Sequence, residues 1–151
     1  MKISIAIFLV LPFLMAGCFL GERHSLVRTV SLNFHVPQGT SEVSLSFTNN
    51  EVQEALKIVD AVLSTNGFVR EIRTDMANVP GFVTAYVRYD SPGLRSGTLP
   101  DIYLRKDRLD VVIVELGNRT THPTGLTDKI CESLREQLSS LYGRKNVKIH
   151  N

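Results

Sequence analysis

Cysteine is scarce in this chain, with Cys18 and Cys131 as its only two copies in 151 residues. So few cysteines exclude a disulfide-stapled scaffold and a cysteine-based zinc cage. The four histidines are also too widely spaced to match known metal-ligand patterns; they are His24, His35, His122 and His150. The sequence therefore predicts neither a metal site nor a cofactor.

An excess of charge of one sign is lacking as well. Lysine and arginine number 17 against 15 aspartate and glutamate residues, and the signs alternate along the chain. Nucleic-acid-binding domains show a basic excess or a basic stripe, so we exclude nucleic acid as a partner. There is no internal repeat, no low-complexity tract and no second long apolar run, which favours one domain.

Catalytic motifs are missing too. The segment GLRSG at 93–97 is not a nucleophile elbow, because Ser96 stands one position late and no strand-to-helix turn is expected around it. Glu132 and Glu136, one helical turn apart with Arg135 between them, are typical of a solvated helix face. We therefore predict no catalytic residue and expect a protein that is not an enzyme.

The first residues have the layout of a secretory signal. Lys2 supplies a positive start, residues 3–15 are almost entirely apolar, and the small residues Ala16 and Gly17 precede Cys18. An ordinary transmembrane anchor is the alternative, since the apolar run to residue 20 has the minimum length to span a bilayer. Pro12 and Gly17 within that run favour the signal.

The stretch LMAGC at 14–18 resembles the lipobox of bacterial prolipoproteins, with Met15 where leucine is usual. The resemblance implies cleavage between Gly17 and Cys18, a diacylglycerol on the Cys18 sulfur and an acylated new amine. Two or more acyl chains anchor a protein stably to a membrane. Phe19 follows the cysteine where aspartate would signal inner-membrane retention, which favours the outer membrane, facing the periplasm, over the inner membrane.

These features divide the chain into a signal peptide at 1–17, a lipidated tether at 18–27 and a single domain at 28–151. Residues 19–26 reach about 25 Å when fully extended. The folded domain is therefore expected to lie close to the bilayer.

Alternating and helical apolar patterns predict the elements of the domain. A capping box from Thr48 to Glu51 starts the first helix, which ends at Asn66 and Gly67. The second helix is predicted at 126–142, with Leu126, Ile130, Leu134, Leu138 and Leu141 on one face. Strands are predicted at 30–36, 43–47, 68–74, 82–89, 102–105, 109–116 and 147–150. We expect an α+β fold, a two-layer sandwich with a mostly antiparallel sheet of five to six strands and two helices on one face.

Two long loops, 90–100 and 117–125, are predicted at the same end of the sheet as the start of the second helix. Five polar side chains would meet there: Asp90, Arg95, Arg119, Thr121 and His122. In an enzyme, His122 would be the base and Arg95 or Arg119 the anion clamp. The alternative is that both segments are ordinary loops, rich in glycine and proline because turns require them.

The strand at 109–116 is apolar on both faces, although a sheet covered on one side is expected to be polar on the other. We predict that Val112, Val114 and Leu116 face the helices. A possible partner face on the other side is then made by Leu109, Val111, Ile113, Phe82 and Tyr86, with Tyr103 beside them. Either the 30–47 hairpin or the tether covers this face, or a partner protein or lipid-like ligand does.

The sequence thus favours a membrane-anchored lipoprotein of the bacterial cell envelope, held by lipid on Cys18, that serves as a non-catalytic binding or assembly module for an envelope protein. Its plan is similar, in architecture alone, to accessory lipoproteins such as the lipopolysaccharide-assembly lipoprotein. The alternatives are an immunity or inhibitor lipoprotein, and a small envelope enzyme built on the 90–100 and 117–125 loops. Cys131 is expected to be a buried, unreactive thiol.

Overall fold

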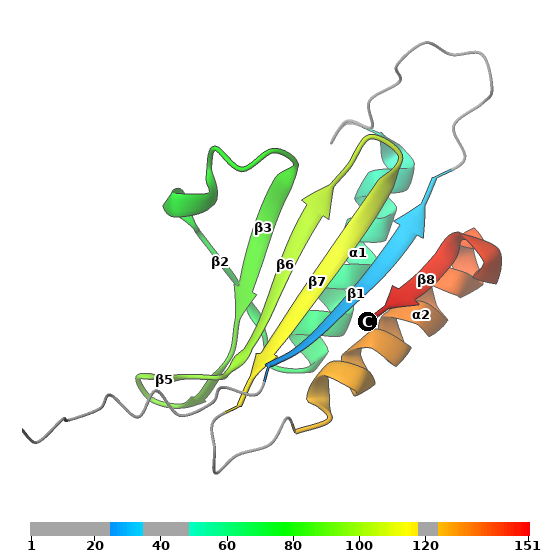
Figure 1. The fold of residues 1–151 in the computed structure, drawn as a ribbon. Helices are drawn as coiled ribbons and strands as arrows, with labels where there is room; N and C mark the ends of the chain where they lie inside the picture. The colour runs from blue at the N-terminus through cyan, green and yellow to red at the C-terminus, as the bar shows by residue number, and fades with distance from the viewer. Residues whose placement is uncertain (1–24, 35–48, 118–123) are drawn as a thin grey trace, which may run out of the picture.

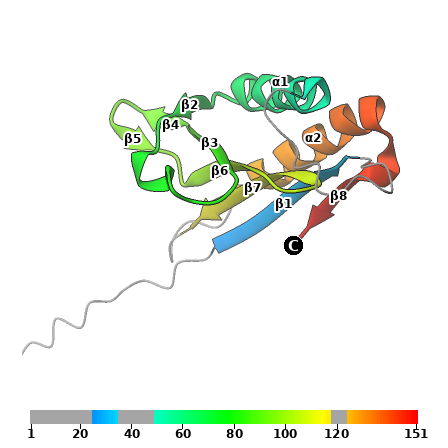
Figure 2. The same cartoon turned by 90° about the horizontal axis from the view of Figure 1, so that it is seen from above.

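A computed structural model describes residues 25–34, 49–117 and 124–151. In these residues two helices cover one face of a six-stranded sheet, which confirms the predicted α+β sandwich (Figures 1 and 2). The larger elements are β1 (Ser25–Asn33), α1 (Asn50–Thr65), β3 (Phe82–Val87), β6 (Thr98–Leu104), β7 (Arg108–Leu116), α2 (Leu126–Tyr142) and β8 (Val147–His150). The shorter ones are β2 (Val69–Glu71), η1 (Thr74–Met76), β4 (Tyr89–Ser91), β5 (Leu94–Arg95) and η2 (Arg144–Asn146).

The strand order is β2-β3-β6-β7-β1-β8, and all neighbouring strands are antiparallel. Helix α1 carries the chain from β1 to β2, and α2 carries it from β7 to β8. Each helix returns the chain to the end of the sheet where the preceding strand began. As a result β1 and β2 run in the same direction, and so do β7 and β8. The starts of β1, β6 and α2 therefore share one end of the sheet with the ends of β3 and β7 (Figure 1). We call this the Ser25 end.

The first helix packs through one apolar stripe. Its buried residues are Val52, Ala55, Val59, Val62 and Leu63, each at most 2% exposed. The observed N-cap is Asn49, whose side chain accepts a hydrogen bond from the Glu51 amide at 2.8 Å. Thr48, the predicted start of the capping box, lies outside the described residues. The chain leaves the helix through Gly67, whose φ of +82° is a conformation that favours glycine.

The second helix has the predicted bounds, and Ile130, Leu134 and Leu138 are buried as expected. Leu141 was predicted on the same face but is 56% exposed. The last turn is held instead by Tyr142. Its ring packs edge-on against the ring of Phe34, with 6.0 Å between the two ring centroids. The Tyr142 hydroxyl also donates a 2.7 Å hydrogen bond to the Glu51 carbonyl, which ties the end of α2 to the start of α1.

The central strands place their core side chains in register. Val111 pairs with Val30 and Ile102, and Leu109 pairs with Leu32 and Leu104. These residues and Ile113 lie in the core beneath the helices, at most 8% exposed. Our assignment of the two faces of β7 was therefore reversed, because a strand that is apolar on both faces takes its orientation from its neighbours. Val112, Val114 and Leu116 point away from the helices.

Several predicted boundaries differ from the structure. The first strand runs from Ser25 to Asn33, so it starts within the 18–27 segment and ends before residue 36. The strand predicted at 43–47 lies outside the described residues. The 68–74 strand is shortened to Val69–Glu71 by the following η1 turn. The 82–89 strand divides at Arg88 into β3 and β4, and the predicted 90–100 loop contains the β4–β5 hairpin and the start of β6.

Neither helix in the described part of the chain is both long and apolar enough to cross a membrane.

The reversed orientation of β7 predicts losses of stability of unequal size for two adjacent substitutions. Ile113→Ala should lower the free energy of unfolding by about 2–5 kcal/mol, because it leaves a cavity under the helices. Val114→Ala should lower it by at most about 1 kcal/mol, since this side chain is on the uncovered face. Urea denaturation of both variants measures the difference. Equal losses would contradict the orientation described here.

Candidate binding face of the sheet

The sheet face opposite α1 and α2 is covered by no α-helix within the described residues (Figure 2). We call it the open face. Its side chains include Val27, Thr29, Ser31, Phe82, Leu99, Asp101, Tyr103, Asp110, Val112, Val114 and Leu116, as the strand register requires. Most of the apolar ones are only partly buried, so this face combines apolar surface with access to solvent. Such a surface commonly marks an interaction site in a monomer.

The apolar part of the open face is concentrated toward the Ser25 end. Val114 on β7 pairs with Val27 on β1 and with Leu99 on β6, so the three side chains lie next to one another across the sheet. We call these three residues the apolar band. Val27 is 44% exposed, and the neighbouring Leu116 is 39% exposed. An aliphatic row this exposed gains stability when another surface covers it.

The far part of the open face is polar and internally satisfied. Asp110 is 5% exposed and accepts a 2.7 Å hydrogen bond from the Ser31 hydroxyl. Arg108 donates to the same carboxylate at 3.1 Å, and Arg105 lies 3.6 Å away. The Arg105 guanidinium also lies over the Tyr103 ring, 5.0 Å from its centroid. A buried polar group needs such partners to offset its loss of hydration, so this network is explained by the fold.

Acidic and basic groups form the β2 side of the open face. Burial raises the pKa of Asp101, and the acids Asp75 and Glu71 act in the same direction against the opposing effect of Arg73. Arg95 forms an ion pair with Glu71. Arg73 donates two hydrogen bonds to the carboxylate of Asp75, so it too is paired within the protein.

The structure describes only two residues of the predicted loop site, Arg95 and Asp90. Arg95 is engaged with Glu71, and Asp90 is paired with Arg88 at 2.7 Å. Arg119, Thr121 and His122 lie outside the described residues. Of the predicted partner face, Leu109, Val111 and Ile113 are core residues. Tyr86 also faces the helices, where its hydroxyl donates a 2.8 Å hydrogen bond to Asp60 of α1. Phe82 lies on the open face, together with Tyr103, and the two rings pack edge-on against each other.

Glu115, an acid within an apolar strand, was not among the predicted site residues. It is 2% exposed and lies at the Ser25 end beneath the start of α2. Its carboxylate accepts hydrogen bonds from the hydroxyls of Thr124 and Thr127, at 2.5 and 2.6 Å. Burial alone would raise the pKa of Glu115, but these hydrogen bonds outweigh it and the pKa is lowered. The carboxylate thus stays ionised and satisfies free groups at the helix start.

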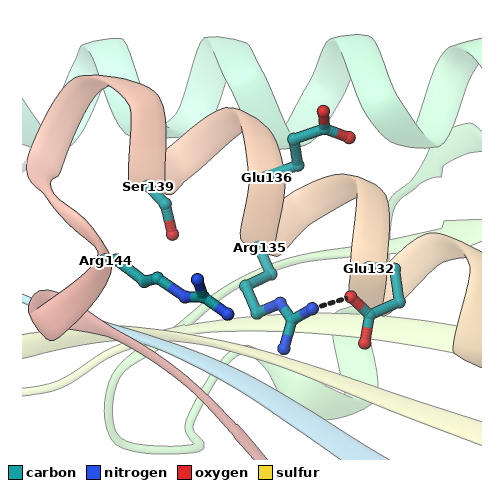
Figure 3. A pocket seen from close by; sticks show the side chains of 5 residues that line it. All are labelled: Glu132, Arg135, Glu136, Ser139 and Arg144. Atoms are coloured by element: carbon teal, nitrogen blue, oxygen red, sulfur yellow. Dashed lines mark ion pairs between the residues drawn. The ribbon is translucent and has the colours of Figure 1, made fainter.

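A small hollow of ≈ 200 Å³ borders Glu115, Arg88, Ser96 and Thr124 at the Ser25 end. A second, of ≈ 360 Å³, lies on the outer side of α2 (Figure 3). Arg135 and Arg144 project into the second hollow, and Arg135 is paired with Glu132. The charges there are mixed and exposed, as expected for a solvated helix face. Neither hollow has the apolar enclosure of a typical small-molecule site.

The described residues offer no group of three or more histidine, cysteine, aspartate and glutamate side chains arranged to hold a metal ion. Cys131 is buried as predicted, and burial, with Asp128 nearby, raises the pKa of its thiol to about 11. A thiol with such a pKa is protonated and unreactive at neutral pH.

No protein-family model, curated protein or solved structure matches this chain.

The role of Glu115 predicts a pH-dependent loss of stability on substitution. Its lowered pKa stabilises the fold above the unfolded-state pKa of about 4.3, and this contribution disappears as the pH falls through the folded-state pKa. Glu115→Gln should therefore cost about 1–3 kcal/mol near neutral pH and less in acid. Urea denaturation at about pH 7 and about pH 3 measures the change. The exposed Glu136→Gln is the matched control on α2, and an equal cost at both pH values would contradict the assignment.

Proposed function

We propose that this protein is a lipid-anchored lipoprotein of the bacterial cell envelope that holds an envelope protein on the open face of its sheet and catalyses no reaction. The observation that carries the proposal is the apolar band of Val27, Leu99 and Val114 on the uncovered side of the sheet. Protein interfaces combine an apolar centre with a polar rim. The open face has this arrangement, with the Asp110 network at one side of the band.

A protein partner fits the open face better than a small ligand does. The face is a broad strand surface, whereas small molecules bind in enclosed, mostly apolar pockets. The hollows described above are open and lined by charged or polar side chains. An extended apolar strip such as the band is complementary to another flat, partly apolar protein surface.

Support for a binding role over catalysis comes from how the polar groups are used. Asp110, Glu115 and Arg95 each have partners within the fold. A catalytic acid or base requires access to a substrate and a pKa near the working pH. The lowered pKa of buried Glu115 and its saturated hydrogen bonds favour a structural role instead.

The LMAGC segment supports the membrane location, with lipid on Cys18. Only six residues separate Cys18 from Ser25, where β1 begins. This spacing would hold the domain against the membrane surface, with the outer membrane, facing the periplasm, favoured by Phe19. A partner bound on the open face would then be held at the same surface.

Replacing the lipidated cysteine tests the anchor. The Cys18→Ser variant should move from the membrane fraction to the soluble fraction or accumulate as uncleaved precursor, because it has no sulfur to carry a diacylglycerol. Cell fractionation and mass measurement of the N-terminal peptide detect this. A variant that remains in the membrane fraction after normal cleavage would contradict the proposal.

Purification of the lipidated, tagged protein in mild detergent tests the partner. The wild type should retain a stoichiometric envelope protein, and Val27→Ser with Val114→Ser should lose it, because the apolar centre of the interface is removed. Leu141→Ser is the matched control, since this exposed leucine is in the last turn of α2.

Circular dichroism first verifies that both variants are folded. Retention of the partner by the double variant, or the absence of any partner from the wild type, would contradict the proposal. A captured toxin or enzyme would identify the binding module as an immunity or inhibitor lipoprotein.

A further inference from the structure

The β4–β5 hairpin projects from the Ser25 end of the sheet and is exposed along its whole length, from Tyr89 to Arg95 (Figure 1). It carries two large apolar side chains into solvent, with Tyr89 53% and Leu94 59% exposed. Neither residue belongs to the core. The fold therefore does not account for their exposure, which costs free energy in water.

The base of the hairpin is attached firmly to the sheet. The Ser96 amide donates to the Arg88 carbonyl at 2.7 Å, and the Leu116 amide donates to the Gly97 carbonyl at 2.9 Å. A Cβ at Gly97 would lie 2.6 Å from the Leu116 carbonyl oxygen, so the close approach of the two strands requires glycine. Tyr89 and Leu94 are thus held in a fixed place relative to β1.

The length of the chain before β1 determines what surface the hairpin can reach. Seven residue steps join Cys18 to Ser25, which is at most about 24 Å when fully extended. The hairpin connects β3 to β6, which lie two or three strands from β1. At a strand spacing of about 4.8 Å this is about 10–14 Å. If Cys18 carries lipid, the hairpin and the acyl chains can reach the same bilayer.

We propose that the β4–β5 hairpin is a second contact with the membrane, in which Tyr89 and Leu94 enter the lipid headgroup region. This inference rests on the proposed lipid anchor at Cys18. Tyrosine is enriched at membrane interfaces, where its ring is in the apolar layer and its hydroxyl remains in water. Leu94 adds apolar area, while the neighbouring Arg95 and Arg88 are paired with Glu71 and Asp90 on the protein itself.

The contact orients the domain, and the acyl chains provide the anchoring. Two exposed side chains contribute little affinity compared with two or three acyl chains. With a tether at Ser25 and a contact at the hairpin, however, the domain is attached at two points across the Ser25 end. The sheet then stands upright on the bilayer, and the open face is directed sideways toward a partner at the same membrane.

The experiment places an environment-sensitive fluorophore at Leu94→Cys in the full lipidated protein, reconstituted in vesicles of phosphatidylethanolamine and phosphatidylglycerol. Leu141→Cys is the matched control, because Leu141 is 56% exposed but in the last turn of α2, away from the Ser25 end. Cys131 does not compete for the label, since it is buried and burial raises its thiol pKa to about 11. Spin-labelled lipids in the vesicles act as quenchers.

The probe at position 94 should emit at shorter wavelength on reconstitution and lose intensity with spin-labelled lipid, while the probe at 141 should do neither. If the protein floats with the vesicles but the two probes show the same emission shift and the same quenching, the hairpin contact is overturned and the anchor stands. Protein that does not float would overturn both the anchor and the contact. In either case circular dichroism of the labelled variants must match the wild type.

Discussion

The packing of α1 and α2 against a single face of the sheet is the constraint on which the rest of this domain depends. The contact is made by the stripe from Val52 to Leu63 on α1 and by Ile130, Leu134 and Leu138 on α2. It fixes β7 with Leu109, Val111 and Ile113 inward, and this orientation propagates to β1 and β6 through the strand register. Because both helices are on one side, no α-helix of the described residues covers the apolar side chains on the other side.

That asymmetry divides the side chains of the domain into two groups, polar ones that the fold uses and apolar ones that it leaves exposed. The polar side chains of the first group have hydrogen-bond or ion-pair partners within the fold. Glu115 holds the start of α2, and Asp110 is held by Ser31 and two arginines. Asp60 joins α1 to Tyr86. The apolar band, by contrast, is a surface that the fold creates and does not use. The β4–β5 hairpin is the second such feature, and both occur toward the end where the chain enters from Cys18.

Much of this architecture could be predicted from local patterns, because apolar periodicity and glycine caps are local properties. The bounds of α2 and the strand at 147–150 agree with prediction. The orientation of β7 could not be predicted, since residues 109–116 are apolar at nearly every position and only the pairing with Val30 and Ile102 selects the inward face. The candidate site moved with it, from Leu109, Val111 and Ile113 to Val27, Leu99 and Val114. Glu115 was missed because its partners, Thr124 just before α2 and Thr127 within it, lie 9 and 12 residues further along the chain.

The central claim is that the open face binds another protein at the membrane, and photo-crosslinking in living cells tests it most directly. A photoreactive amino acid replaces Val114 on the open face, and the same replacement at Leu141 is the control. The account predicts that illumination links position 114 to one envelope protein and leaves position 141 without that adduct. A crosslink from position 114 only to this chain itself, or no crosslink at all, would contradict it.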